Sequence, residues 1–131
     1  MPIHKAEDLK ATPDIKNPNI SMIQFGGELI KIGIVTYMAG EGPPPHYHPN
    51  DEQWIYPLEG RAAVLVGDEV KAVGPGDVIH IPRNAVHGHR VIEGPFRFFS
   101  CKSPAGSGKL SEDYTDVPNT EELRQRLAEV S

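Results

Sequence analysis

Short apolar runs follow one another from Asn19 onwards and are separated by glycine, proline and asparagine. The runs are rich in β-branched and aromatic residues, which favour extended strands. Eight segments have this pattern: residues 20–25, 29–38, 53–60, 62–67, 69–73, 77–82, 87–92 and 96–101. Short strands at this spacing predict an all-β sandwich or barrel.

The two ends of the chain have different patterns. Residues 1–18 are polar, with prolines at positions 2, 13 and 18, and we expect them to form a lead-in segment. The barrel is then expected to span residues 19–117, followed by a short C-terminal helix within residues 118–131. A chain of 131 residues is long enough for one such domain with a single core.

The helix is predicted from the spacing of apolar residues near the C-terminus. Leu123, Leu127 and Val130 recur at i, i+4 and i+7, which places them on one face of a helix. Asn119 or Thr120 precedes this pattern and can cap its first turn. We expect the narrow apolar stripe to pack on the barrel or on a partner subunit.

Composition excludes several classes of partner. The formal net charge is −5 and no lysine or arginine cluster is present, so the positive surface that binds nucleic acid phosphates is missing. No apolar run reaches the length of about 18 residues that crosses a membrane. Cys101 is the single cysteine, which excludes an internal disulfide and predicts a buried apolar role and a cytoplasmic protein.

Histidines are the most informative polar residues. Six histidines in this chain would give about 0.2 His-x-His pairs by chance, yet two are present, His46/His48 and His87/His89. In an extended segment residues i and i+2 share a face, so each pair can bring two imidazoles to one place. Imidazole binds Zn, Ni, Fe and Cu. Either pair alone is equally compatible with solvated surface histidines.

The segments GEGPPPHYHPNDEQWIYPLEG and GDVIHIPRNAVHGHRV resemble the two motifs of the cupin family of small metal-binding β-barrels. Seven of the ten motif positions agree, namely Gly40, His46, His48, Gly60, Gly76, Pro82 and His87. The three departures are Gln53 at the acid position, Asn84 at a glycine position and Val91 at an asparagine position. The resemblance implies a jelly-roll β-barrel that holds a divalent transition metal (Zn, Ni, Fe, Mn or Cu) through His46, His48, Gln53 and His87.

Glu52 and Gln53 compete for the fourth ligand position. Neighbouring strand residues point to opposite faces, so only one of the two can face the lumen. The apolar residues that follow do not decide between them. The spacing to Gly60 favours Gln53, and some small cupins resemble this chain in carrying glutamine there, but Glu52 stays as the alternative.

The choice of ligand changes the expected chemistry. With Gln53 all four ligands are neutral, so a divalent ion keeps its full charge and is a stronger Lewis acid. With Glu52 one unit of charge is cancelled, which favours iron and oxygen chemistry. His89 shares the face of His87 if the strand is regular and is the candidate general acid or base, although a structural role is also open.

Three further interpretations concern residues near the motifs. His80 is expected to be a packed or hydrogen-bonded strand residue. Arg83 can hold a substrate carboxylate, or it is an ordinary solvated loop residue. Trp54 and Tyr56 are expected to face away from the metal and to pack under a neighbouring segment or a second subunit.

Together these features predict a metal-dependent enzyme that acts on an oxygen-rich small molecule without redox change, as an isomerase, cyclase or lyase. The resemblance suggests cupins that linearise unsaturated uronates and cupin cyclases of polyketide pathways. The alternatives are an iron-dependent cupin dioxygenase and a non-catalytic cupin that binds a small molecule. The resemblance also implies a homodimer, whereas nucleic acid and membrane partners are not expected.

Overall fold

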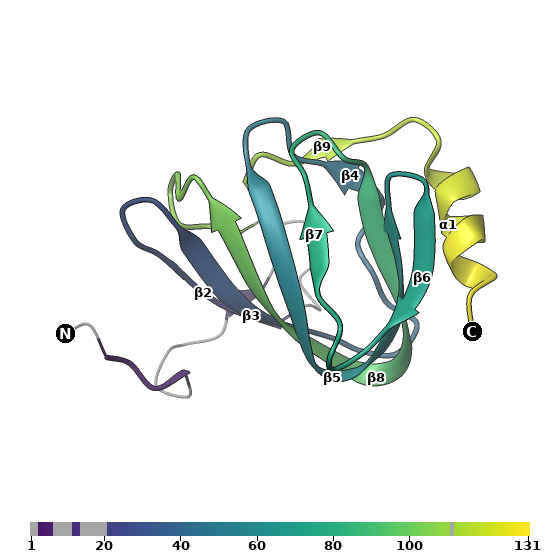
Figure 1. Ribbon diagram of the computed structural model, residues 1–131, viewed down its shortest axis with the longest axis horizontal. Helices are drawn as coiled ribbons and strands as arrows, with labels where there is room; N and C mark the ends of the chain where they lie inside the picture. Colours follow the sequence, from purple (N-terminus) through teal and green to yellow (C-terminus); the bar gives the residue numbers. More distant parts are fainter. Residues whose placement is uncertain (1–2, 7–11, 14–20, 111) are drawn as a thin grey trace.

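The computed structural model describes residues 3–6, 12–13, 21–110 and 112–131. Antiparallel strands curl into a barrel-like sheet, and one helix packs beside it (Figure 1). The elements are β1 (Thr12–Pro13), β2 (Ser21–Gly26), β3 (Lys31–Tyr37), β4 (His46–Tyr47), β5 (Glu52–Val66), β6 (Glu69–Val73), β7 (Ile79–Ile81), β8 (His87–Ser103), β9 (Thr115–Asp116) and α1 (Thr120–Ala128). This is the all-β jelly roll with a short C-terminal helix that the sequence predicts. The predicted boundary of the lead-in segment lies outside the described residues.

Strands β5 and β8 form the middle of the sheet and correct the predicted strand list. Residues 53–60 and 62–67 were expected as two strands, but β5 runs through both, and β8 likewise runs through residues 87–92 and 96–101. The prediction was wrong here because a glycine bends β5 without ending it: Gly60 has φ +83°, and the pairing of β5 with β8 shifts register on both sides of it.

Alternation along β5 divides the apolar residues between two cores. Ala62 faces the barrel interior, where it packs with residues such as Val91 and Phe96. Ala63 and Leu65 face the other way, towards α1. The barrel interior therefore keeps its own apolar cluster, separate from the one beneath α1.

Helix α1 docks on the outside of the barrel through the predicted stripe. Leu123 and Leu127 are buried against β5, and burial of each leucine is worth about 1.5–3 kcal/mol. The Arg90 guanidinium on β8 donates to the carbonyl oxygens of Leu127 and Val130, which satisfies acceptors left open at the C-terminal end of the helix. None of the described helices is long and apolar enough to cross a membrane.

Backbone conformation explains one departure from the cupin motifs. Gly40, Gly60 and Gly76 all have φ between +83° and +101°, and Asn84, which stands at a motif glycine position, has φ +71°. Asparagine adopts this left-handed region more readily than other residues with a side chain. The Asn84 N–H also donates to the carbonyl oxygen of His48 at 2.9 Å. The substitution therefore keeps the loop that fastens the second motif to the first.

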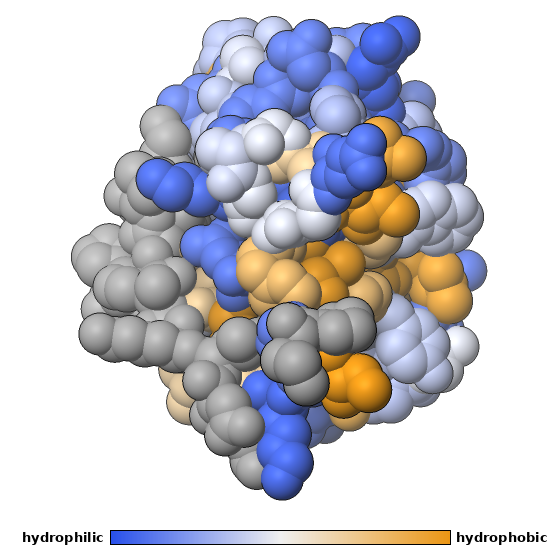
Figure 2. All heavy atoms as spheres, turned by 90° about the vertical axis from the view of Figure 1, so that its left-hand side faces the viewer, coloured by the Kyte–Doolittle hydropathy of each residue, from blue (hydrophilic) through white to orange (hydrophobic). Residues whose placement is uncertain are grey.

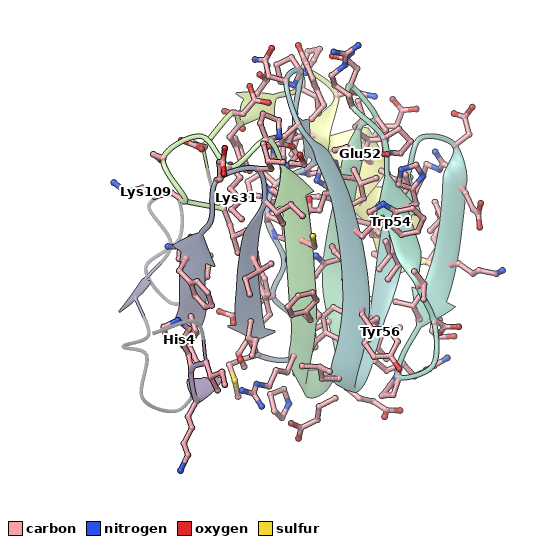
Figure 3. All side chains as sticks on the ribbon, turned by 60° about the vertical axis from the view of Figure 1, so that its left-hand side comes forward. His4, Lys31, Glu52, Trp54, Tyr56 and Lys109 are labelled. Atoms are coloured by element: carbon pink, nitrogen blue, oxygen red, sulfur yellow. The ribbon has the colours of Figure 1, made fainter. Side chains whose placement is uncertain are left out.

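The outer face of the sheet carries exposed apolar side chains. Trp54, Tyr56 and Leu58 on β5 are between 43% and 48% exposed, and the two aromatic residues lie on the same side of the strand (Figure 3). They face away from the lumen, as predicted, and the Trp54 ring stacks on His80 at 4.2 Å. A space-filling view from the β2 and β3 side shows apolar side chains gathered in the middle of that face, with hydrophilic ones around them (Figure 2).

Candidate metal centre

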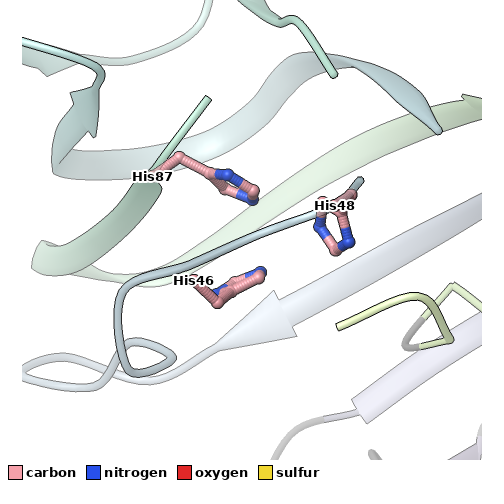
Figure 4. A group of neighbouring side chains, drawn as sticks. All are labelled: His46, His48 and His87. Atoms are coloured by element: carbon pink, nitrogen blue, oxygen red, sulfur yellow. The ribbon is translucent and has the colours of Figure 1, made fainter. Parts of the chain in front are cut away.

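Three histidines from the two motifs meet inside the barrel. His46 lies on β4 and pairs directly with His87, the first residue of β8, while His48 follows two residues after His46. One ring nitrogen of each histidine lies within 4.8 Å of the other two. The three rings face a common point (Figure 4). All three residues are less than 7% exposed.

Backbone carbonyl groups fix the orientation of each ring. The Nδ1 of His46 lies 2.8 Å from the Pro44 oxygen, and the Nδ1 of His87 lies 3.0 Å from the Ala85 oxygen. The Nδ1 of His48 lies 2.8 Å from the oxygen of Asp113. A carbonyl oxygen only accepts, so each Nδ1 carries the proton and each Nε2 keeps a lone pair. Three aligned neutral donors fit a divalent transition metal.

The surroundings keep these imidazoles uncharged. Burial is the largest cause and lowers the pKa of His46 to about 2, of His48 to about 3 and of His87 to about 4. The pKa of His46 is lowered further because a second proton on this imidazole cluster would be repelled by the first, on His87, and the pKa of His48 is lowered further by the positive charge of Lys102. The histidines are therefore ready to bind a metal at neutral pH without first losing a proton.

The structure separates the two candidates for the fourth ligand. Gln53 is 7% exposed and lines the same cavity as the three histidines. Its Nε2 donates to the Ser100 hydroxyl at 2.8 Å, which leaves the carbonyl oxygen Oε1 for a cation. Glu52 points to the outer face and its carboxylate accepts a hydrogen bond from His80 Nε2 at 2.6 Å. Gln53, and not Glu52, is thus the residue that this strand register brings to the histidines.

His89, the candidate acid or base, lies on the same face of β8 as His87 and lines the cavity. Its ring meets the Tyr37 ring edge-on, with the centroids 4.4 Å apart. The Nε2 atom is shielded from solvent and has no hydrogen-bond partner among the described residues. Burial, with help from His87, lowers the pKa of His89 to about 3. A neutral imidazole with an unsatisfied nitrogen is therefore part of the cavity lining.

The other polar candidates lie elsewhere. Arg83 is exposed in the loop before β8 and does not line this cavity. His80 is on the outer face, hydrogen bonded to Glu52 and stacked on Trp54. Neither residue is placed to touch a ligand of the histidine site.

Two site residues were missed by the sequence analysis. Lys102 is 3% exposed, lines the cavity and places its Nζ 3.4 Å from His48 Nε2. The last predicted strand ends at Cys101, but the inward alternation of Phe96 and Phe98 continues through Ser100 to Lys102 and could have identified it. Tyr114 stacks on His46 with the ring centroids 4.0 Å apart. It lies in a loop far along the chain, where no sequence pattern indicates such a contact.

The cavity has a volume of about 80 Å³, and a single water needs about 10–15 Å³ of cavity. An ion and a small ligand therefore fit together. The lining combines polar and apolar side chains. The lining consists of Met22, Val35, Tyr37, Pro43, His46, His48, Gln53, Ile55, His87, His89, Phe98, Ser100, Lys102, Leu110 and Tyr114.

Known proteins resemble this chain in sequence and in fold. A stretch of 64 residues, 45% of this chain, is 32% identical to quercetin 2,3-dioxygenase of Bacillus subtilis (strain 168), and the match covers only 19% of that protein. The polyketide cyclase RemF from Streptomyces resistomycificus has a TM-score of 0.69 and 26% identity, over 86% of this chain and 89% of RemF. KdgF from Halomonas sp. has a TM-score of 0.68 over 75% of this chain and 88% of KdgF, and at 22% identity this likeness concerns the fold.

The family is shown by a match that contains both motifs. Residues 33–101, more than half of the chain, match the model of the cupin domain. The matched range runs from within β3 to within β8 and includes His46, His48, Gln53 and His87. The chain therefore belongs to the cupin family.

Proposed function

We propose that this cupin is a metal-dependent enzyme that uses Lewis-acid chemistry, of the isomerase, cyclase or lyase type, on an oxygen-rich small molecule. The observation that carries the proposal is the neutral donor set. Three Nε2 lone pairs converge with an amide residue, while the Glu52 carboxylate lies on the outer face. The Asp51 carboxylate lies 4.0 Å from His48 on the Nδ1 side of the ring and does not line the cavity. The similarity to the polyketide cyclase RemF supports this class. Unsaturated uronates and polyketides are the substrates that we propose to test first.

The residues that would hold the metal are His46, His48, His87 and Gln53. A divalent transition ion bound by neutral groups keeps its charge, polarises a ligand oxygen and stabilises an enolate-like anion. The identity of the ion, among Zn, Ni, Fe, Mn and Cu, is not decided by this donor set.

His89 is the residue that we propose to move the proton. It lies on the cavity wall, its Nε2 has no partner among the described residues, and it is uncharged at neutral pH. A neutral imidazole can accept a proton from carbon or oxygen and return it at another atom. Tyr37 and Phe98 pack around the His89 ring and keep water from it, which strengthens electrostatic interactions inside the site.

A second candidate function is an iron-dependent dioxygenase, which the match to quercetin 2,3-dioxygenase favours. An assay with and without oxygen separates the two. Under the proposed function, turnover of a uronate or polyketide substrate by the metal-loaded protein is expected to be the same in air and in a sealed anaerobic vessel, with no oxygen consumed. Turnover that stops without oxygen would contradict the proposal and support the dioxygenase. Stable binding of a substrate without product in either vessel would support a non-catalytic role.

The ligand assignment makes a separate prediction. Gln53→Ala is expected to weaken metal affinity about 10–100-fold, the range typical for loss of a supporting group at a metal site. Glu52→Ala is the matched control. It removes a full negative charge from the neighbouring residue, but that residue lies on the outer face, so the metal affinity is expected to change less than about 2-fold. Competition titration with a chelating dye measures both. A larger loss of metal affinity in Glu52→Ala than in Gln53→Ala would identify Glu52 as the ligand and contradict the prediction.

A homodimer remains a proposal, and the exposed apolar face around Trp54 and Tyr56 is the surface that we propose a second copy would cover. Large exposed apolar patches on a protein surface commonly mark interaction sites. A cytoplasmic location also remains a prediction from the single cysteine.

A further inference from the structure

A buried lysine stands beside the metal ligands. Lys31, Lys102 and Gln53 are in register on the adjacent strands β3, β8 and β5, so their side chains share the inner face of the sheet. Lys31 is 1% exposed and Lys102 is 3% exposed. Of the two lysines only Lys102 lines the cavity of the histidines.

Two acids lie near these lysines. The Lys31 Nζ lies 2.9 Å from Glu112 Oε1 and 3.8 Å from Asp51 Oδ2, and the Asp51 carboxylate also feels the positive charge of Lys102. Asp51 is itself 3% exposed, and no hydrogen bond to its carboxylate is formed by the described residues. The negative charge of Asp51 offsets part of the positive charge of the two ammonium groups. Asp51 lies outside the cavity, because the residues that line the cavity include no aspartate or glutamate.

A metal in this site would increase the positive charge. The four proposed ligands are neutral, so a divalent ion adds two charges next to the Lys102 ammonium. Buried charge is costly unless an opposite charge pairs with it. The cavity lining contains no negatively charged side chain. An anionic ligand would supply the missing negative charge.

The contacts of Lys102 show how it would reach such a ligand. Its Nζ donates to the carbonyl oxygen of Leu110 and to His48 Nε2, the latter at 3.4 Å. The same Nε2 lone pair is the one that a metal takes. Metal binding would therefore release one N–H of the ammonium at the cavity wall, next to the coordination sphere.

We propose that Lys102 is the specificity-determining residue that binds the anionic oxygen of the ligand, and that the ligand is a small carboxylate or enolate with an apolar body. The inference rests on the proposed function for the presence of the metal. The apolar wall formed by residues such as Met22, Val35 and Leu110 would accept the rest of the molecule. The volume of about 80 Å³ limits the enclosed part to a few atoms.

The test compares two probes of nearly equal shape, lactate and its uncharged amide, lactamide. Cobalt(II)-loaded protein is titrated with each, and binding is followed through the visible absorption of the cobalt. In Lys102→Met, lactate affinity is expected to fall at least 10-fold while lactamide affinity changes less than 2-fold. Lys31→Met is the matched control, since it removes a buried lysine from the same row but outside the cavity, and it is expected to leave both affinities within 2-fold. Lys102→Arg is expected to recover most of the lactate affinity.

Equal losses for lactate and lactamide in Lys102→Met, or no loss of lactate affinity, would overturn the inference. Cobalt content is measured first. A wild-type protein that takes up no stoichiometric cobalt contradicts the proposed function, and calorimetric titration of the metal-free protein then decides the role of Lys102 by the same comparison. Should Lys102→Met not fold, cobalt-loaded Lys102→Gln takes its place: a loss of affinity for lactate alone supports the inference, and equal losses for lactate and lactamide, or no loss, contradict it.

Discussion

His46→Ala is expected to abolish stoichiometric metal binding. Purified wild-type protein should carry about one transition-metal ion per chain, and the variant less than about a tenth of that after dialysis. The physical reason is the loss of one of three imidazoles whose rings are already aligned by the backbone, so that the remaining donors no longer surround the ion. The affinity should fall by more than the roughly 100-fold that outer groups of a metal site contribute at most. Elemental analysis and a competition titration measure the two quantities.

Two comparisons make this result specific. His80→Ala removes a histidine from the outer face, where the ring contacts Trp54 and Glu52, and it is expected to keep its metal. Circular dichroism should show that both variants retain the sheet, because His46 lies on a strand of only two residues at the barrel opening. A His46→Ala protein with unchanged metal content would refute the histidine site and with it the proposed chemistry.

Much of this architecture follows from local sequence patterns. Runs of β-branched residues predict the strands, and the i, i+4, i+7 spacing predicts α1. Each His-x-His pair predicts two imidazoles on one face, and the resemblance to the cupin motifs implies that His46, His48 and His87 lie close together. These signals are local because side chains alternate in strands with a period of two. The bend at Gly60 was misread because a glycine that curves a strand and a glycine that ends one have the same local sequence.

The rest depends on contacts between distant parts of the chain. Adjacent Glu52 and Gln53 cannot be separated by their apolar neighbours, and only the pairing of Gln53 with β7 and β8 turns it inward. Lys102 was missed because a lysine at the end of a strand is normally solvated. The carbonyl oxygen of Leu110 accepts a hydrogen bond from the buried Lys102 ammonium, and Tyr114 stacks on His46 in the same cavity. Long-range packing of this kind has no sequence period.

The metal-free protein is expected to lose stability steeply as the pH falls below about 6.5. His46, His48 and His87 have pKa values of about 2, 3 and 4 in the folded chain, against an ordinary value of about 6.5. At pH values between the folded-state pKa values and 6.5, these histidines are protonated in the unfolded chain but neutral in the folded chain. A lower pH therefore favours unfolding. The stabilisation is fully present above pH 6.5 and is lost as the pH falls towards the folded-state values.

The size of the effect follows from the number of buried histidines. His89 belongs to them, because burial lowers its pKa to about 3. Each contributes up to about 1.4 kcal/mol per pH unit, so the four together give a slope of up to about 5.5 kcal/mol per pH unit. A domain of this kind has a total stability of about 5–15 kcal/mol, which places acid unfolding between about pH 4 and 5.5. Asp51 acts in the opposite direction, because burial raises its pKa and the folded chain then binds that proton more readily. It offsets at most one of the four histidines.

Urea unfolding in the presence of a chelator, at intervals between pH 7.5 and 5, measures the slope directly. His87→Gln is expected to reduce the slope by about a quarter, because it removes one of four buried imidazoles that resist protonation. A stability that stays constant from pH 6.5 to 5 would mean that the three imidazoles accept protons as easily in the folded chain as in the unfolded one, which is incompatible with a buried cluster of neutral metal donors.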